Sequence, residues 1–359
     1  MKACIIVGTR PEIIKMSPVI RACELKGAEY FVLHTGQHYS YELDRKMFED
    51  LELKEPRYNL DVGSKPFAKQ IGFMAAKIKE ILKKEKPDIV FVQGDTNSVL
   101  AGAIASSSLS ISLGHVEAGL RSFDLSMVEE TNRIITDNLS SLLFAPTEEA
   151  VKNLNDESIT KNVFLTGNTI VDAVRQNLEI ANKKVDILGK LGLKKDRYVA
   201  VTAHRAENVD VKERLQGILE GLKLVGEELG IPIIYPIHPR TEKMINEFRI
   251  EKPGNIRFLK PMGFLEFLQL ESNAKLIITD SGGLQEEACI LKIPCVTVRD
   301  STERPETVKL GMNVLAGADQ DKIAESARLM LKKKIVWKNP FGDGKSGERI
   351  VEISLKHLG

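Results

Sequence analysis

The sequence contains little cysteine and no low-complexity tract. Four cysteines occur in 359 residues, and they form neither a CxxC pair nor a framework of short spacings. This pattern argues against a disulfide-stapled secreted domain and against structural zinc, and it favours a reducing, cytoplasmic location. The four are Cys4, Cys23, Cys289 and Cys295.

An excess of charge of either sign is also missing. Lys plus Arg (51) nearly balance Asp plus Glu (50), so the formal net charge is +1. A chain without an overall field does not attract nucleic acid or an anionic membrane, and we expect neither as a partner. Any anion site must therefore be built locally.

Long apolar runs are scarce. A run of only five apolar residues precedes Arg10 and Glu12, which is too short for the core of a secretory signal peptide, so we expect no leader. Residues 96–116 lack Asp, Glu, Lys and Arg and are long enough to span a bilayer. Serines and two glycines interrupt this stretch, so we interpret it as a helix followed by a buried strand.

The sequence does contain a regular alternation of short apolar runs with helical patterns, which is typical of a parallel sheet covered by helices. The alternation starts afresh after a polar, helical stretch at about residues 171–195. We therefore predict an α/β protein with two Rossmann-like, doubly wound domains facing a central cleft. The expected boundaries are 1–167, joined by a C-terminal helix at about 346–359, and 168–345. The runs are CIIVG, YFVLH, DIVFVQG, ISLGHV, SLLFAP and VFLTG, then YVAVTAH, PIIYPIH, IRFLK, KLIITD and PCVTV.

Polar residues follow these strands, where ligands bind in open α/β sheets. In TDSGGLQEEA, Ser281, Gly282 and Gly283 can point backbone N–H groups at a phosphate, or Ser281 can be a plain helix N-cap before a glycine turn. Glu287, one turn into the helix, can accept from ribose hydroxyls or favour the positive helix end.

The first strand ends in GTRPEIIK. Arg10 and Lys15 can both reach a diphosphate, although a lone lysine is more often a solvated surface residue. His34 and His38 flank Gly36 at a strand end rather than on one helix face, so we expect no metal there.

In TAHRAEN, His204 ends a strand beside polar residues. This cluster can neutralise a leaving phosphate or form a helix-entry hydrogen-bond network.

Acids gather near residues 95–130. Asp95 and Glu117 each follow an apolar strand, and Glu129 and Glu130 open a helical pattern. Taken together they predict a carboxylate cluster whose pKa values diverge, which supplies an acid and a base. The structural alternatives are an N-cap for Asp95, a pair between Glu117 and Arg121, and a pair between Glu129 and Arg133.

The motifs of the chain resemble, in order and along nearly its whole length, those of the non-hydrolysing UDP-N-acetylglucosamine 2-epimerases. They are GTRPEIIK, TGQHYS, QGDT, GHVEAGLRSFDLSMVEETNR, PTEEA, TGNTIVDA, TAHRAEN, YPIHP, TDSGGLQEEA, RDSTERPE and NPFGDGKSGERI.

This resemblance implies a GT-B-like fold and reversible conversion of UDP-GlcNAc to UDP-ManNAc by elimination and re-addition of UDP through 2-acetamidoglucal. It further implies a cytoplasmic homodimer in polysaccharide biosynthesis, with no metal and no other cofactor.

The resemblance also suggests the site. It assigns proton transfer to Asp95, Glu117 and Glu129, and assistance to the departing UDP to His204. It leaves the choice between Glu129 and Glu130 open, because the preceding loop is about two residues shorter than in common bacterial members. The suggested UDP-sugar contacts are Arg10, Lys15, Ser281, Gly282, Gly283 and Arg304 for the diphosphate and nearby sugar, Glu287 for the ribose, Phe267 for the uracil, and His238 as a further candidate.

Other functions fit parts of this pattern. A GT-B glycosyltransferase, a non-catalytic UDP-sugar sensor, an epimerase of a 2,3-diacetamido uronic acid nucleotide, or a hydrolysing relative would use a similar nucleotide site. Many relatives bind a second UDP-GlcNAc as activator through residues that match Gln37 and His38 and through an arginine. Because no arginine occurs between Arg57 and Arg121, we expect this activation to be weakened or reorganised.

Overall fold

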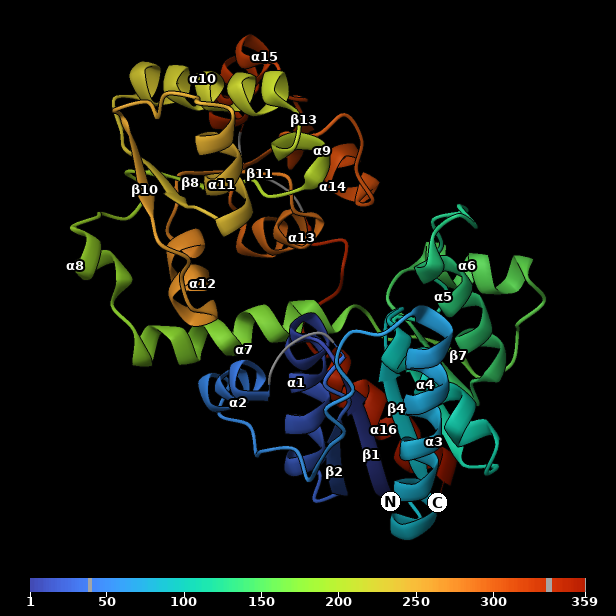
Figure 1. The fold of residues 1–359 in the computed structure, drawn as a ribbon. Coiled ribbons are helices and arrows are strands. Elements are labelled where there is room, and N and C mark those ends of the chain that lie inside the picture. Colours follow the sequence, from blue (N-terminus) through green and yellow to red (C-terminus); the bar gives the residue numbers. More distant parts are fainter. Residues whose placement is uncertain (38–40, 334–337, 359) are drawn as a thin grey trace. The chain divides into compact units, whose positions relative to one another are not determined.

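The computed structural model describes residues 1–37, 41–333 and 338–358. The chain divides into two compact units, which are described separately (Figure 1). Unit 1 comprises Met1–Gln176 with Phe341–Gly359, and unit 2 comprises Asn177–Pro340. Helix α7 (Thr169–Lys184) continues across the boundary. The domain boundaries expected from the sequence stay a prediction.

Unit 1 contains a parallel seven-stranded sheet in the order β3-β2-β1-β4-β5-β6-β7. Its strands are β1 (Lys2–Val7), β2 (Glu29–His34), β3 (Tyr58–Asn59), β4 (Ile89–Gln93), β5 (Ser112–Val116), β6 (Leu142–Ala145) and β7 (Val163–Leu165). Its other helices are α1 (Arg10–Leu25), α2 (Tyr41–Asp50), α3 (Phe67–Glu85), α4 (Asn97–Ser107), α5 (Val128–Leu139), α6 (Glu148–Asp156) and α16 (Ser346–Leu358).

Unit 2 contains a parallel six-stranded sheet in the order β10-β9-β8-β11-β12-β13. Its strands are β8 (Val199–Thr202), β9 (Ile233–Pro236), β10 (Ile256–Leu259), β11 (Leu276–Thr279), β12 (Cys295–Thr297) and β13 (Asn313–Leu315). Its helices are α8 (Ile187–Leu191), α9 (Ala206–Val209), α10 (Lys212–Leu229), α11 (Pro239–Glu247), α12 (Phe264–Ser272), α13 (Gly282–Leu291), α14 (Pro305–Lys309) and α15 (Gln320–Lys332).

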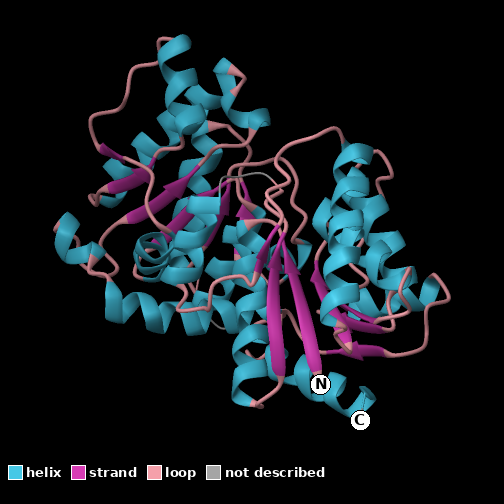
Figure 2. Cartoon of the chain, turned by 60° about the horizontal axis from the view of Figure 1, so that its bottom comes forward, coloured by secondary structure: helices cyan, strands magenta, loops and turns pink. Residues whose placement is uncertain are grey.

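Helices flank the strands of both sheets (Figure 2), so the strands are buried and read as continuous apolar runs. Strand order reverses between β1 and β4 in unit 1 and between β8 and β11 in unit 2. In open parallel sheets, ligands bind outside the carboxyl ends of the strands beside such a reversal. The fold therefore places one candidate ligand site in each unit, at the edge of the sheet formed by the carboxyl ends of its strands. This edge is called the rim below.

Two local features follow from sequence. The charge-free stretch 96–116 forms α4 and β5, as we predicted from its serines and glycines. Helix α16 packs on α1 at Gly347, where a Cβ would lie 2.7 Å from the carbonyl carbon of Pro18. Among the described residues, no helix has both the length and the apolar character that crossing a membrane requires.

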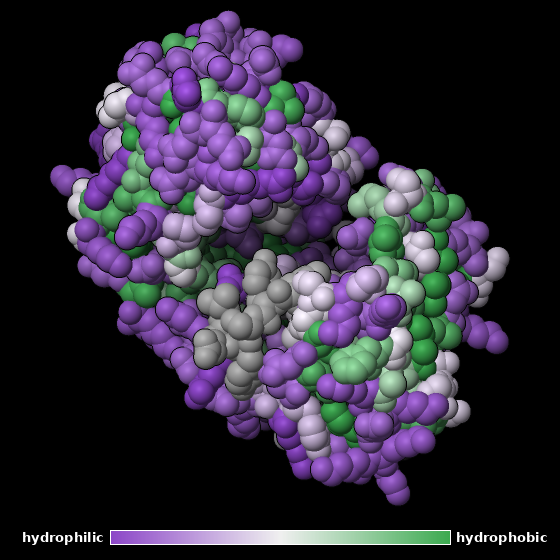
Figure 3. Space-filling view, in the orientation of Figure 1, coloured by the Kyte–Doolittle hydropathy of each residue, from purple (hydrophilic) through white to green (hydrophobic). Residues whose placement is uncertain are grey.

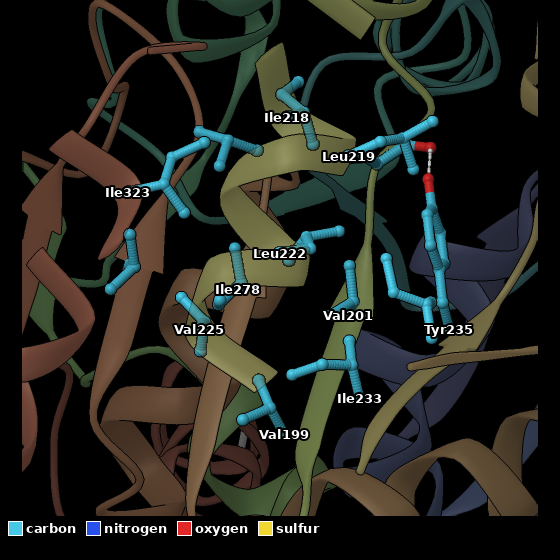
Figure 4. Close-up of a cluster of buried hydrophobic side chains, with 14 of the residues drawn as sticks. Val199, Val201, Ile218, Leu219, Leu222, Val225, Ile233, Tyr235, Ile278 and Ile323 are labelled. Carbon is cyan, nitrogen blue, oxygen red and sulfur yellow. Dashed lines mark hydrogen bonds between the residues drawn. The ribbon is translucent and has the colours of Figure 1, made fainter. Parts of the chain in front are cut away.

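The core of unit 2 supports its rim directly. Apolar side chains from α10, α15 and the central strands pack together, and Tyr235 lies at the edge of this cluster (Figure 4). The Tyr235 hydroxyl donates to the carbonyl of Ala203 at 2.7 Å, and Thr241 donates to the same oxygen at 2.7 Å. These bonds fix the turn immediately before His204.

Candidate active site

In unit 1, Glu117 lies directly after β5 and is almost completely buried. Its Oε1 is 2.6 Å from the Lys15 ammonium, and the amide of Gln93 donates to its Oε2. A positive and a neutral donor thus stabilise a negative charge on Glu117. Its backbone is left-handed, with a φ of 70°, which costs about 1–2 kcal/mol for a non-glycine residue. Strain of this kind clusters at functional sites.

Asp95 follows β4, the neighbouring strand. Its Oδ2 accepts from Nε and Nη2 of Arg133 at 3.0 and 2.6 Å, and its carbonyl accepts from Asn132 at 2.8 Å. The N-cap of α4 is Thr96, whose hydroxyl accepts from Val99 N–H, so the alternative that Asp95 is the N-cap is wrong. Asp95 is instead held by α5 and remains about one-third exposed.

Glu130 and Glu129 have different surroundings. Glu130 is buried and accepts from the N–H groups of Ser122 and Phe123, each at 2.9 Å, and from Arg133 at 2.5 Å. Burial opposes its charge, but these donors outweigh burial and hold the pKa of Glu130 below its ordinary value. Glu129 is exposed in the first turn of α5. Glu130 therefore orders the loop, whereas Glu129 is exposed to solvent.

Neither of the two ion pairs considered as structural alternatives forms in this region. Arg121 pairs with Asp137 at 2.7 Å and with Glu157 at 2.6 Å rather than with Glu117, because residues 117–119 form a turn and not a helix. Arg133 pairs with Asp95 and Glu130 rather than with Glu129.

A buried network that the sequence did not indicate lies behind Asp95. His115 is fully buried, with Nδ1 2.6 Å from Asp137 and Nε2 2.8 Å from the carbonyl oxygen of Gly94. Both ring nitrogens of His115 therefore face acceptor oxygens. The Arg121 guanidinium lies on the other oxygen of Asp137. The network ties α5 to the turn that carries Asp95.

Glu12, another buried acid, connects the β1 and β4 turns. Its carboxylate accepts from Gly8 N–H at 2.7 Å and from the hydroxyls of Thr9 and Thr96 at 3.0 and 2.6 Å. Burial raises the pKa of Glu12 above its ordinary value, although these donors oppose the rise. We infer that Glu12 fixes the spacing between the first helix and the Asp95 turn.

Arg10 opens α1 with a partly exposed side chain, and its Nε lies 3.9 Å from Asp44. His34 is fully buried, with Nε2 3.3 Å from the same Asp44. His38, the second member of the pair considered for a metal, lies outside the described residues. Within the described ranges, no three His, Cys, Asp or Glu side chains are grouped so as to hold a metal ion.

In unit 2, a cavity of about 180 Å³ collects three of the predicted residues, His204, His238 and Phe267. Met262 also lines it. The two imidazole rings are 5.5 Å apart, and Nδ1 of His238 accepts from Arg240 N–H at 3.1 Å. Burial, followed by repulsion from His204, lowers the pKa of His238. A neutral, partly apolar pocket of this kind suits a nucleobase.

Asp280 holds the His204 turn. It is fully buried, and its Oδ2 accepts from the N–H groups of His204 and Arg205, each at 2.8 Å. Its Oδ1 lies 3.6 Å from Nδ1 of His204, which is beyond hydrogen-bonding distance. Asp280 was not among the predicted site residues.

The N-terminus of α13 begins beside Asp280. Ser281 is its N-cap and accepts from Leu284 N–H at 3.4 Å, which is one of the two roles that the sequence left open. Gly282 and Gly283 have no left-handed backbone, and a Cβ on Gly283 would meet nothing closer than 3.9 Å. Neither backbone conformation nor crowding thus requires glycine at 283, whereas close approach of a phosphate would.

The two remaining candidates lie close to α13. Arg304 pairs with Glu286 at 2.7 Å, and Glu287 lies one turn after Gly283 on the same helix face.

A family model described as UDP-N-acetylglucosamine 2-epimerase matches residues 21–355 of the chain. The UDP-N-acetylglucosamine 2-epimerase of Methanocaldococcus jannaschii is 54% identical over 360 residues, which cover 98% of each chain.

The chain belongs to the UDP-N-acetylglucosamine 2-epimerase family. A crystal structure of the M. jannaschii UDP-GlcNAc 2-epimerase in complex with UDP-GlcNAc and UDP matches 99% of this chain and 100% of that chain, at 54% identity and a TM-score of 0.86. The UDP-2,3-diacetamido-2,3-dideoxy-D-glucuronate 2-epimerase of Pseudomonas aeruginosa is 39% identical and covers 99% of this chain and 100% of its own.

These comparisons confirm two predictions from the sequence, namely the epimerase family and the GT-B-like α/β fold with two doubly wound sheets. Within this family member, the structure brings Lys15 to Glu117, and His204 to His238 and Phe267. The roles of all the candidate residues in catalysis or binding stay predictions.

Proposed function

We propose that the protein interconverts UDP-GlcNAc and UDP-ManNAc by elimination and re-addition of UDP. The observation that carries this proposal is the pair of strand-end carboxylates, Asp95 and Glu117, each held by a cation at the β4 and β5 ends of one sheet. Full-length likeness to an epimerase whose structure contains UDP-GlcNAc and UDP supports the substrate.

The chemistry explains why acids gather at this rim. The C2 proton of the sugar is not adjacent to a carbonyl group, so a base alone cannot remove it readily. As the bond from C1 to the diphosphate oxygen breaks, positive character grows at C1 and a carboxylate can take the C2 proton. UDP then adds back to 2-acetamidoglucal while a proton returns to C2 on the opposite face. Two faces require two proton-handling groups, which Asp95, Glu117 and Glu129 supply.

Unit 2 supplies the nucleotide contacts in this proposal. Phe267 packs on the uracil in the cavity that also contains His238. The N–H groups of the α13 N-terminus, with Ser281 and Gly282, bind the diphosphate. Gly283 and Glu287 are separated by about 6 Å along the helix axis, which fits a phosphate followed by a ribose.

Positively charged and acidic groups complete the assignment. His204, whose backbone N–H is held by Asp280, assists departure of UDP, while Arg10, Lys15 and Arg304 neutralise the diphosphate and nearby sugar. Met262 offers only backbone polar atoms to the uracil. The expectation that the rims of the two units meet around the substrate stays a prediction, as do the cytoplasmic location and the role in polysaccharide biosynthesis.

Isotope labelling tests the elimination step. When the purified protein converts UDP-GlcNAc in D2O, we expect deuterium at C2 of the UDP-ManNAc formed. An oxygen label in the C1 to phosphate bridge is expected to scramble into non-bridging β-phosphate positions. Both are read by NMR without added metal, nicotinamide or acceptor. Retention of the original C2 hydrogen in the product would rule out elimination.

A second substrate has a specific observation in its favour. The likeness to the P. aeruginosa diacetamido-glucuronate epimerase extends over the whole chain. The same UDP and C2 chemistry serves both sugars, which differ at C3 and C6. Comparing turnover of the two nucleotide sugars decides between them, since a strong preference for the uronic acid would replace UDP-GlcNAc as the substrate.

We also propose a homodimer formed through an apolar face of unit 1. Helices α3, α4 and α5 pack side by side and expose large apolar side chains, and hydrophobic atoms gather over this part of the molecule (Figure 3). Patches of this kind mark interaction sites. The face comprises Phe67, Phe73, Ile104, Val128 and Ile135.

Replacing Ile104 by arginine places a charge on the middle helix of this face. We expect the apparent mass in solution to halve, as measured by light scattering after gel filtration. Leu329→Arg, on an exposed position of α15 in unit 2, is the control and should leave the dimer intact. A dimer that survives Ile104→Arg would place the interface elsewhere.

A further inference from the structure

Helix α12 carries a buried acid beside the nucleotide site that no part of the proposed mechanism uses. Glu271 is fully buried and lies one turn after Phe267, on the same face of α12. It belongs to the last turn of the helix, where the partial negative charge of the helix end disfavours a carboxylate. A buried charge without a cation is costly, so the surroundings favour a neutral acid.

Both carboxyl oxygens of Glu271 are buried without a hydrogen-bond partner among the described residues. Glu287, on the neighbouring helix α13, is the charged group that acts on this acid. Burial first, and then the charge of Glu287, raise the pKa of Glu271 well above its ordinary value. A neutral Glu271 can therefore donate to an ionised Glu287.

We propose that Glu271 is a positioning residue, whose proton orients the Glu287 carboxylate toward the ribose hydroxyls of UDP. This inference rests on the proposed role of Glu287 in ribose binding. In this arrangement one oxygen of Glu287 accepts from Glu271, and this bond fixes the plane of the carboxylate that the ribose meets. The arrangement links α12, which carries the uracil contact Phe267, to the ribose contact on α13.

Two further titratable groups feel the charge of Glu271, and both are neutral near pH 7. Tyr198, just before β8, donates its hydroxyl to the carbonyl of Leu270, and burial raises its pKa. Cys295 on β12 is also buried, which raises its pKa to about 12. Glu287 is therefore the charged group that opposes ionisation of Glu271. When Glu271 loses its proton at alkaline pH, two adjacent carboxylates repel each other and the ribose contact weakens.

The test compares UDP with 2′,3′-dideoxyuridine 5′-diphosphate, which lacks both ribose hydroxyls, by calorimetry on the full chain. The native protein is expected to prefer UDP about tenfold, the value of roughly one charge-assisted hydrogen bond. Glu271→Met removes the proton donor and should abolish this preference while leaving the affinity for the dideoxy analogue unchanged. If Glu271 had only a structural role, Glu271→Met would lower the affinities for both ligands by the same factor.

Glu271→Gln is the conservative variant, because its amide still donates to Glu287 but does not titrate. It should keep the preference as the pH is raised, whereas the preference of the native protein should fall at alkaline pH as Glu271 ionises. UDP and the dideoxy analogue carry the same uracil and diphosphate groups. Titration of these groups therefore cancels in the ratio of the two affinities.

The outcomes separate this inference from the proposed function. If the native protein fails to bind UDP, the proposed function itself is wrong. If the native protein binds both ligands equally, Glu287 does not hold the ribose and Glu271 has no such role. If the native protein prefers UDP and Glu271→Met retains that preference, the inference about Glu271 is overturned while the proposed function stands.

Discussion

Glu117→Gln is expected to lower turnover by about 10²-fold or more, with a much smaller change in UDP affinity. A positioned proton-transfer group commonly contributes on this scale. The amide keeps the shape of the side chain and one acceptor oxygen for Lys15, and its NH2 group can donate to the Gln93 amide once that amide is flipped. An amide cannot take the C2 proton. Turnover is measured by NMR of the two nucleotide sugars, and UDP binding by calorimetry.

The same loss is expected for Asp95→Asn and Glu129→Gln. Glu148→Gln is the matched control for Glu129, since both are exposed acids in the first turn of a helix of unit 1. Near-normal turnover in all three amide variants would contradict the proposed chemistry and leave these acids with structural roles only.

Substitutions of the adjacent acids Glu129 and Glu130 distinguish an effect on turnover from an effect on stability. Glu130 holds the 122–123 backbone, so Glu130→Gln is expected to lower thermal stability through the loop. Glu129→Gln should instead leave stability unchanged and lower turnover. The opposite pattern would reverse the assignment of the third acid.

Strand periodicity predicted most of both sheets, because buried parallel strands are nearly continuous apolar runs. The strands that the pattern missed are short: β3 has two residues and β13 has three. Each lies at a sheet edge and pairs with only one neighbour, so little apolar surface is required of it.

The candidate site was predictable only where an ionisable side chain lies close to the end of a predicted strand. Asp95, Glu117 and His204 follow strands directly, so sequence order alone placed them at a rim. Their partners were not predictable in the same way. The expected pair of Glu117 and Arg121 assumed helical spacing, whereas Glu117 has a left-handed backbone that turns the chain.

Partners from distant segments were missed altogether. Asp137 reaches His115 across 22 residues, and Lys15 reaches Glu117 across 102 residues. Tertiary packing decides such pairs, and no local pattern in the sequence indicates them. The same reason kept Asp280 and Glu271 out of the prediction, since each reads locally as an ordinary polar residue at the end of a strand or helix.

Asp137→Asn is expected to destabilise unit 1 by about 3–5 kcal/mol, the cost of removing one partner from a buried ion pair. Asp137 is buried between His115 and Arg121, and both of these partners are buried as well. Without the charge of Asp137, the Arg121 guanidinium is left with the partly exposed Glu157 as its anionic partner. Because two-unit chains do not unfold in one step, hydrogen exchange of unit 1 peptides in the full chain is the suitable measurement. Asp156→Asn, an exposed acid at the end of α6, is the matched control.

The pH dependence gives this prediction a second readout. Burial opposes the charge on Asp137, but His115 and Arg121 outweigh it and hold its pKa below the ordinary value. A carboxyl group with a lowered pKa in the folded state stabilises the fold above its unfolded pKa of about 3.9, and this contribution is lost as the pH falls toward the folded value. The difference between the native protein and Asp137→Asn should thus be full at neutral pH and shrink below about pH 4. Native-like exchange of unit 1 in the variant at neutral pH would show that Asp137 does not hold α5 against the Asp95 turn.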